Sequence, residues 1–234
     1  MNTLHALEAF DRMLTDGVRA CRQYQGRAYV DFPRVMNYAA LGRERELNAI
    51  VDSVKLRMPD RSVSPEFLLP WAVHELRVHG HPAAATRLAT RIVAWHDSTT
   101  SSQGFHRPWA RAVALLAARE WKRAARVLDS TSATDSSVQI AGARAFAHAM
   151  AGDTAVARGI LARLELRRDA FSDGTSRGSA ATLMALGDTV RAVSDLSGAL
   201  AGASHGDLFH YRPVALYEFL HGYAAFDALI KPVR

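Results

Sequence analysis

Three histidines near one predicted helix end are the strongest metal-binding candidates in the chain. His74, His79 and His81 lie close together, and His79 and His81 flank Gly80. A transition metal would need a third or fourth ligand, and only Glu75 is near in sequence. Histidines beside a helix-ending glycine are more often ordinary polar cap residues, so we expect no metal site here.

The segment "DGTSRGS" (173–179) has the glycine, serine and arginine of an anion-binding loop. It lacks the lysine and the spacing of a motif that cradles phosphate. We therefore interpret this segment as the Gly/Ser-rich entry to a helix, capped by Asp173 or Thr175.

No other residue pattern points to catalysis. Cys21 is the single cysteine, so neither an intrachain disulfide nor a thiolate metal site is available. The sequence contains no Ser-His-Asp elbow, no HExxH motif and no Cys-x-x-Cys motif. We predict that the chain is not an enzyme and uses no cofactor and no metal.

The composition favours a helical protein. Of 234 residues, 49% are hydrophobic and 8% aromatic, and alanine, leucine and arginine dominate. No stretch approaches the run of about 18 apolar residues that a membrane span needs. The N-terminal segment carries Glu8, Asp11 and Asp16 and does not resemble a secretory signal. We expect a cytoplasmic location.

The formal net charge of +6 comes mainly from arginines that are spread along the chain. They often stand beside Glu or Asp, as in "RERE" (43–46). Such dispersed charge is typical of solvated helix faces and less so of a nucleic-acid-binding patch.

Two stretches repeat one pattern: "AMAGDTAVARGILARL" (149–164) and "MALGDTVRAVSDLSGAL" (184–200). Gly152 and Gly187 suit the left-handed residue that ends a helix. Asp153 and Asp188 suit the N-cap of the next helix. The apolar residues that follow recur at helical spacing. Each stretch is therefore predicted to be a tight turn between two antiparallel helices.

Three further hinges are predicted at Gly42, at Gly80 and at Arg119-Glu120. The residues that follow these five turns at equivalent positions are spaced by 38, 39, 33 and 35 residues: Leu47, Ala85, Ala124, Ala157 and Ala192. Units of similar length indicate a stacked array of helical hairpins.

This pattern resembles the tetratricopeptide repeat, a helix–turn–helix unit of about 34 residues. The match is strongest around Gly152-Asp153 and Gly187-Asp188, where small residues stand before and after the turn. The first units depart from it, since Val73 and Leu47 occupy small-residue positions and the usual aromatic residues are mostly absent. The resemblance implies an all-α fold, a right-handed α-solenoid of about five hairpins.

We expect one domain over 1–234, with an N-terminal capping helix in 1–28, repeats in 29–203 and a C-terminal cap in 204–234. The cap is expected to hold one or two short helices around "RPVALYEFL" and "YAAFDALI". Loops are expected where Ser, Thr, Asp, Gly or Pro gather, at 57–65, 96–108, 129–137 and 167–179.

A narrower likeness rests on "HELRVHGHPAAA", the two "GDT" hairpins and the ending "RPVALYEFLHGYAAFDALIKP" (212–232). These are similar to C-terminal helical-repeat regions of large bacterial signalling proteins, which often follow a serine/threonine kinase or another effector domain. This chain has no kinase phosphate loop or catalytic loop. The likeness implies an effector partner, attached or separate.

In tetratricopeptide superhelices the first helix of each pair lines a concave groove. That mapping assigns ten residues to the inner face: Met36, Phe67, His74, Arg77, Trp109, Val113, Phe146, Met150, Arg177 and Met184. A surface rich in aromatic residues and methionine suits adaptable binding. The alternative is that these residues pack against neighbouring helices. The family's carboxylate-clamp positions hold Phe32, Pro70, Trp109 and Gly142, which disfavours binding of an acidic chaperone tail.

The sequence therefore predicts a non-catalytic protein–protein interaction module, a scaffold or sensor for a signalling or regulatory partner. Binding of RNA or another nucleic acid is the alternative, based on the net charge and a hairpin spacing shared with RNA-reading repeats. A third hypothesis, a closed toroid with an enzymatic pocket, needs clustered carboxylates at the helix ends, and the sequence does not show them.

Overall fold

The structure of this protein is a computed structural model that describes residues 28–55, 65–98, 106–133, 137–166, 172–201 and 222–229. Every regular element in these ranges is an α-helix, which confirms the all-α prediction. None of the described helices combines the length and the apolar character needed to cross a bilayer. Residues 1–27 of the predicted N-terminal cap and the segment "RPVALYEFL" lie outside the described residues.

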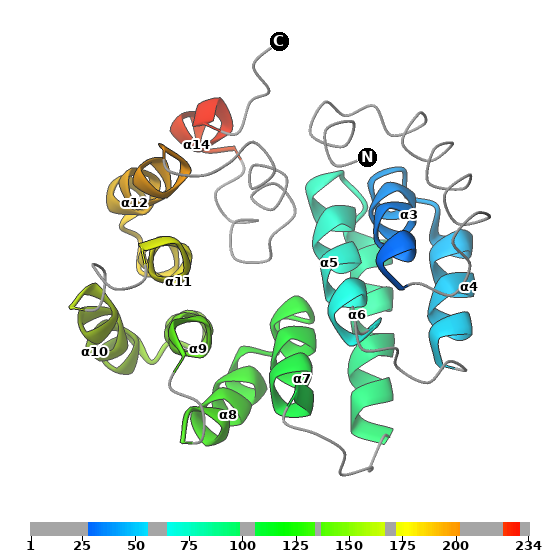
Figure 1. The fold of residues 1–234 in the computed structure, drawn as a ribbon, viewed down its shortest axis with the longest axis horizontal. Coiled ribbons are helices and arrows are strands. Elements are labelled where there is room, and N and C mark those ends of the chain that lie inside the picture. The colour runs from blue at the N-terminus through cyan, green and yellow to red at the C-terminus, as the bar shows by residue number, and fades with distance from the viewer. Residues whose placement is uncertain are drawn as a thin grey trace.

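Within those ranges the helices alternate as first and second members of pairs (Figure 1). The first helices are α3 (Ala28–Ala40), α5 (Pro65–Val78), α7 (His106–Ala117), α9 (Val138–Ala151) and α11 (Ser172–Ala185). The second helices are α4 (Glu44–Lys55), α6 (Pro82–Ser98), α8 (Trp121–Ser132), α10 (Thr154–Glu165) and α12 (Thr189–Ala201). Helix α14 (Ala224–Leu229) falls within the predicted "YAAFDALI" segment.

The turns inside the pairs lie at the five predicted hinges and share one geometry. A residue with φ between 59° and 93° stands at each turn: Gly42, Gly80, Arg119, Gly152 and Gly187. At the end of α9, the Gly152 N–H donates to the Ala149 carbonyl and the Asp153 N–H to the His148 carbonyl, at 3.1 and 2.8 Å. The same two bonds close the other four turns. They form the Schellman motif, which satisfies the last carbonyls of a helix.

The second helices begin in the same register. The fifth residue after each left-handed position is buried and donates its N–H to the carbonyl four residues earlier: Leu47, Ala85, Ala124, Ala157 and Ala192. These are the residues that the sequence pattern treats as equivalent. The hinge positions and the register of the second helices are therefore confirmed.

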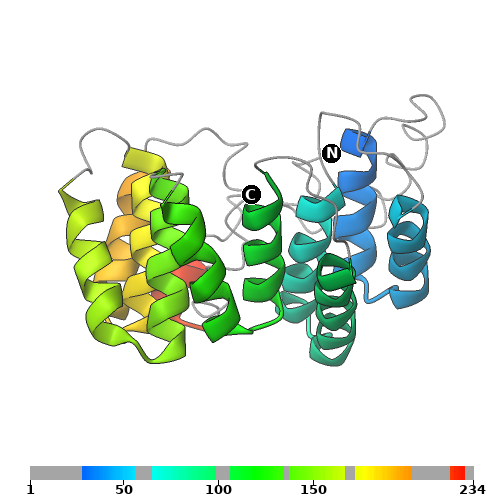
Figure 2. The same cartoon turned by 90° about the horizontal axis from the view of Figure 1, so that it is seen from below.

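The helices follow one another along a curved row (Figure 1). Helices α3, α5 and α7 pack in succession, as do α9 and α11, and each first helix also packs on its own second helix. Helix α8 joins the two parts because it packs on both α7 and α9. First helices such as α7 and α9 lie toward the inside of the curve, while α8 and α10 lie outside. Seen from below, most helices stand roughly side by side (Figure 2).

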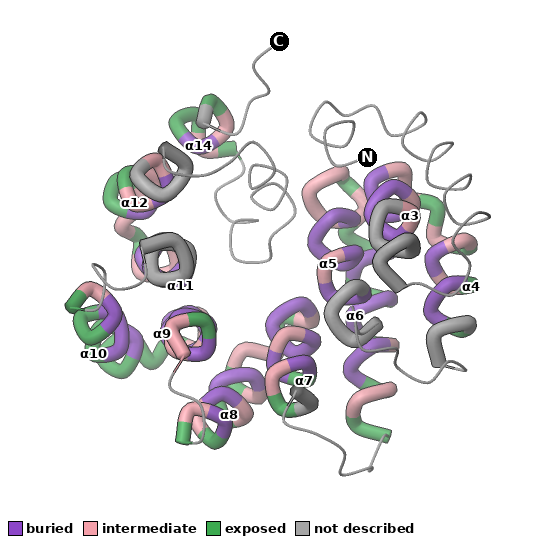
Figure 3. The backbone as a smooth tube through the Cα atoms, in the orientation of Figure 1, coloured by how far each residue is buried: buried purple, intermediate pink, exposed green. Residues whose placement is uncertain are grey.

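The apolar core runs between the helices along the row (Figure 3). One cluster extends from α3 to α9, reaches α11 through Ala181, and includes Leu76, Leu115, Leu128 and Phe146. A second cluster joins α10, α11, α12 and α14 around Phe226. Burial of each large apolar side chain contributes about 1.5–3 kcal/mol. The stability of the row therefore comes mainly from contacts between neighbouring helices.

All four expected loops are partly helical: Pro65 begins α5, and residues 96–98 and 106–108 belong to α6 and α7. Helix α11 begins at Ser172, so all of "DGTSRGS" lies inside a helix, and Asp173 and Thr175 are not caps that precede it. Glycine is tolerated here because α11 crosses α9 closely: a Cβ on Gly142 would lie 2.7 Å from the Gly178 Cα. The packing of the two helices thus outweighs the poor helix propensity of glycine.

Helix α8 also continues through Ser132, into the loop expected at 129–137. The Ser130 and Thr131 hydroxyls donate to the Val127 carbonyl, and the Ser132 hydroxyl donates to the Asp129 carbonyl. These side chains bond back to their own helix, so their turn-forming tendency is not expressed.

Candidate functional site

The ten predicted binding residues lie on successive first helices. Met36 lies on α3, Phe67, His74 and Arg77 on α5, Trp109 and Val113 on α7, Phe146 and Met150 on α9, and Arg177 and Met184 on α11. The side chains of Phe67 and Arg177 lie outside the described residues. The other eight divide by how far they reach the surface.

Three of the eight are interior. Met36, His74 and Phe146 are 0%, 2% and 1% exposed. Phe146 belongs to the larger core cluster and meets the Trp121 ring edge-on, with ring centroids 5.7 Å apart. For these residues the structure shows interior packing in place of a surface position. An α-helix presents only part of its circumference to solvent, and these residues fall on the part that faces its neighbours.

Arg77 is half-buried and joins two first helices. Its Nη2 donates to the Ala117 carbonyl at 2.6 Å, across the contact between α5 and α7. Ala117 is the last residue of α7, where carbonyls have no partner within the helix. A cation at this end also interacts favourably with the helix dipole. Arg77 therefore provides a hydrogen-bond donor for the C-terminal end of α7.

Four predicted residues keep partly exposed side chains: Trp109, Val113, Met150 and Met184. We call them the inner-face set, because their helices α7, α9 and α11 lie on the inside of the curve (Figure 1). Trp109 and Met150 pack on the edge of the larger cluster, and Met184 packs on the second cluster. These three side chains are thus held by the core while part of each remains exposed, and Val113 is likewise only partly buried.

Two of the positions equivalent to a carboxylate clamp are used for packing. Pro70 is buried inside α5. Gly142 lies where α9 approaches the α11 backbone. The Phe32 side chain is outside the described residues.

The histidine-rich turn makes local contacts. His79 directly follows α5, and its Nε2 lies 3.2 Å from Oε1 of Glu75 on that helix. The His81 ring covers Gly42 of the preceding turn, where a Cβ would meet the ring at 2.5–2.8 Å. No group of three metal-ligating side chains occurs among the described residues. The two histidines therefore pack around consecutive turns.

Arginine–carboxylate pairs connect neighbouring hairpins. Arg87 contacts Glu44 between α6 and α4, Arg191 contacts Glu165 between α12 and α10, and Arg91 contacts Asp52 between α6 and α4. Hydrogen bonding to Arg87 lowers the pKa of Glu44 against the opposing effect of burial. Many of the dispersed arginines thus have partners on an adjacent hairpin.

Asp97, near the end of α6, accepts hydrogen bonds from two arginines on other helices. Arg111 of α7 and Arg123 of α8 both lie 2.8 Å from its carboxylate. Hydrogen bonding to Arg123 lowers the pKa of Asp97, burial opposes this, and Arg111 lowers it further. The Asp97 carboxylate therefore joins α6, α7 and α8.

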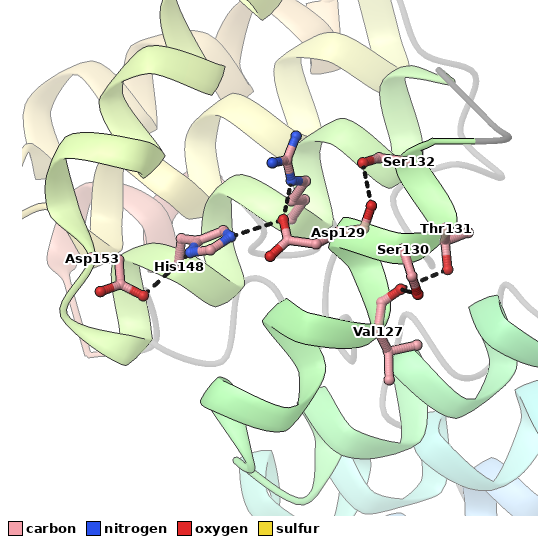
Figure 4. Close-up of polar contacts among 8 residues, drawn as sticks. Val127, Asp129, Ser130, Thr131, Ser132, His148 and Asp153 are labelled. Carbon is pink, nitrogen blue, oxygen red and sulfur yellow. Dashed lines mark hydrogen bonds and ion pairs between the residues drawn. The ribbon is translucent and has the colours of Figure 1, made fainter.

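A buried histidine lies at the centre of one polar cluster (Figure 4). His148 of α9 lies between Asp129 of α8 and Asp153 of the α9–α10 turn. Arg144 Nε donates to Asp129 Oδ1 at 2.5 Å. Burial alone would raise the pKa of Asp129, but the hydrogen bonds from His148 and Arg144 outweigh it and lower that pKa. We call these four residues the His148 cluster.

Sequence reasoning missed the His148 cluster. It takes Asp153 as the N-cap of α10, but the Asp153 side chain makes no capping bond. In the equivalent turn, Asp188 Oδ1 does accept a hydrogen bond from the Arg191 N–H, at 3.2 Å. The difference is the residue five positions before the aspartate, which is His148 in one turn and Leu183 in the other. That contrast is the one signal the sequence offers.

Comparison of the chain with protein-family models, with curated proteins and with solved structures gave no match.

Proposed function

We propose that this protein is a non-catalytic interaction module: a right-handed, tetratricopeptide-like α-solenoid that binds a protein or peptide partner along its first helices. The partner is a separate chain or an attached effector domain in a signalling or regulatory system. One observation carries the proposal. Residues of the inner-face set remain partly exposed on three successive first helices, although Trp109, Met150 and Met184 each pack against the core.

The chemistry of the inner-face set suits recognition. Tryptophan and methionine supply large contact areas, and methionine adapts to partners of different shape. Exposed large apolar residues also occur on the second helices, at Val156 of α10 and Val190 of α12. Scattered single residues of that kind are ordinary on protein surfaces, and they serve here as controls.

The test uses a peptide selected from a displayed library against the immobilised full chain, with affinity measured by fluorescence anisotropy. Replacing Trp109 and Met150 together by alanine is expected to weaken binding by about tenfold or more, as loss of a central contact does. The double variant Val156→Ala, Val190→Ala is expected to bind within about twofold of the parent. Circular dichroism checks that both variants stay helical.

Two results would count against the proposal. Equal peptide affinities for the Trp109/Met150 variant and the parent would show that these two residues do not contribute to binding. Stronger loss in the Val156/Val190 variant would move the binding surface to the second helices. Retention of single-stranded RNA on a filter at low salt, with a steep fall as salt is added, would support the nucleic-acid alternative instead.

A further inference from the structure

His148 lies between two carboxylates on different elements (Figure 4). Its Nε2 is 3.1 Å from Asp129 Oδ1 on α8, and its Nδ1 is 3.3 Å from Asp153 Oδ2 in the α9–α10 turn. The histidine itself is 8% exposed. The ring therefore bridges α8 and the turn that leads into α10.

Both contacts require a protonated ring. An ionised carboxylate only accepts hydrogen bonds, so each ring nitrogen must carry a proton in order to donate to its partner. A neutral imidazole has one N–H and would direct a lone pair at the other carboxylate. The observed geometry thus fits the imidazolium and leaves the neutral ring with one bond at most.

The surroundings indicate which bond is retained when the ring is neutral. Asp129 also accepts from Arg144 Nε, so its position is held from a second side. The Asp153 side chain is 59% exposed and makes no other side-chain hydrogen bond among the described residues. The charged groups facing His148 are thus Asp129 from α8 and Asp153 from the turn before α10. No described charged side chain of α11, on the opposite side of α9, contacts it.

We propose that His148 is a proton-dependent clamp between consecutive hairpins. With the ring protonated, it holds α8 and the α9–α10 turn together; with the ring neutral, it keeps Asp129 and releases Asp153. The protonated ring thus makes a bond between the two hairpins that the neutral ring cannot make.

The chain contains its own control for this clamp. The Gly187-Asp188 turn closes with the same two backbone bonds as the Gly152-Asp153 turn. There Leu183 stands in the position of His148, and Asp188 caps α12. The two turns therefore share their backbone and differ in the titrating side chain.

The first experiment measures urea unfolding of the full chain at about pH 6 and about pH 8, which bracket the titration of a histidine. The parent midpoint is expected to fall between the two values by more than that of His148→Gln, which hydrogen-bonds without titrating. Asp153→Asn is expected to remove part of the same pH dependence, and Asp188→Asn is expected to retain it. Parallel pH dependences for the parent and both cluster variants would overturn the proposal.

The second experiment does not depend on any variant folding. Amide exchange of the ¹⁵N-labelled parent reports on the Asp153 N–H, which closes the turn onto the His148 carbonyl. Its protection factor is expected to fall roughly threefold to tenfold from about pH 6 to about pH 8, while that of Asp188 stays constant. Equal changes at the two amides would overturn the proposal.

Discussion

At the scale of the residue, Arg119 shows how a turn can dictate an unfavourable backbone. It has φ of 59°, in a position that glycine occupies in the other four hairpin turns. A side chain in this region costs about 1–2 kcal/mol, because its Cβ crowds the following carbonyl. The Schellman bonds from Arg119 and Glu120 to the end of α7 maintain the conformation nonetheless.

Replacing Arg119 by glycine is expected to raise the free energy of unfolding by about 0.5–1 kcal/mol, since relief of strain exceeds the added chain entropy. Urea denaturation measures the change. Gly80→Ala is the opposite control: its φ is 84° and a Cβ there would meet open space, so backbone strain alone should destabilise it. A loss of stability in Arg119→Gly would show that the arginine side chain contributes more than its strain costs.

At the scale of the element, the α9–α11 crossing depends on the absence of side chains. Gly142 and Gly178 approach so closely that a Cβ on either would lie 2.7 Å from the other's Cα. The atoms in contact are backbone atoms on both helices. A side-chain rotation therefore cannot make room for an added Cβ. The crossing therefore sets how closely the fourth and fifth pairs pack.

Gly142→Ala is expected to lower the free energy of unfolding by about 1–3 kcal/mol, because α9 and α11 must separate. Gly159 offers a matched control, since it lies on the exposed face of α10 and a Cβ there would meet nothing within 4 Å. Gly159→Ala is expected to stabilise by about 0.5–1 kcal/mol through helix propensity. Stabilisation by Gly142→Ala, as expected for Gly159→Ala, would show that the crossing relaxes without cost.

At the scale of the whole molecule, polar contacts join hairpin to hairpin along the row. Glu44, Asp97 and Asp129 each contact an arginine on another helix, and the pKa of each carboxyl group is lowered. Single exposed pairs of this kind contribute about 0–1 kcal/mol each. Their common effect is on the dependence of stability on pH and salt.

We expect the free energy of unfolding to fall as the pH drops below about 4, the ordinary range of these carboxyl groups. Their lowered pKa values mean that the unfolded chain binds more protons than the folded chain there, so stability rises with pH. Urea titrations between neutral pH and acid measure the slope. Asp97→Asn should make it shallower, and added salt should weaken the effect. A slope unchanged in Asp97→Asn would assign the acid sensitivity to other groups.

The turns and the helix pairing were predictable because their causes are local. Glycine followed by aspartate, with apolar residues at helical spacing on both sides, led to the hinges at Gly152 and Gly187. The exposure of residues on the first helices was not predictable to the same degree. Met36 and Met150 carry the same side chain on two first helices, α3 and α9, yet one is buried and the other partly exposed. Their difference depends on which neighbouring helix covers each position.

The sequence by itself determined the helical class, the five hinges and the shared register of the second helices, since backbone conformation at a turn depends on a few adjacent residues. Only the tertiary structure decided that "DGTSRGS" is helical, that Arg77 bonds to the last carbonyl of α7 and that His148 bridges Asp129 and Asp153. These outcomes depend on contacts between residues far apart in the chain. The energies of such contacts exceed the local preferences of glycine, serine and aspartate, and the spacing of residues in sequence does not encode them.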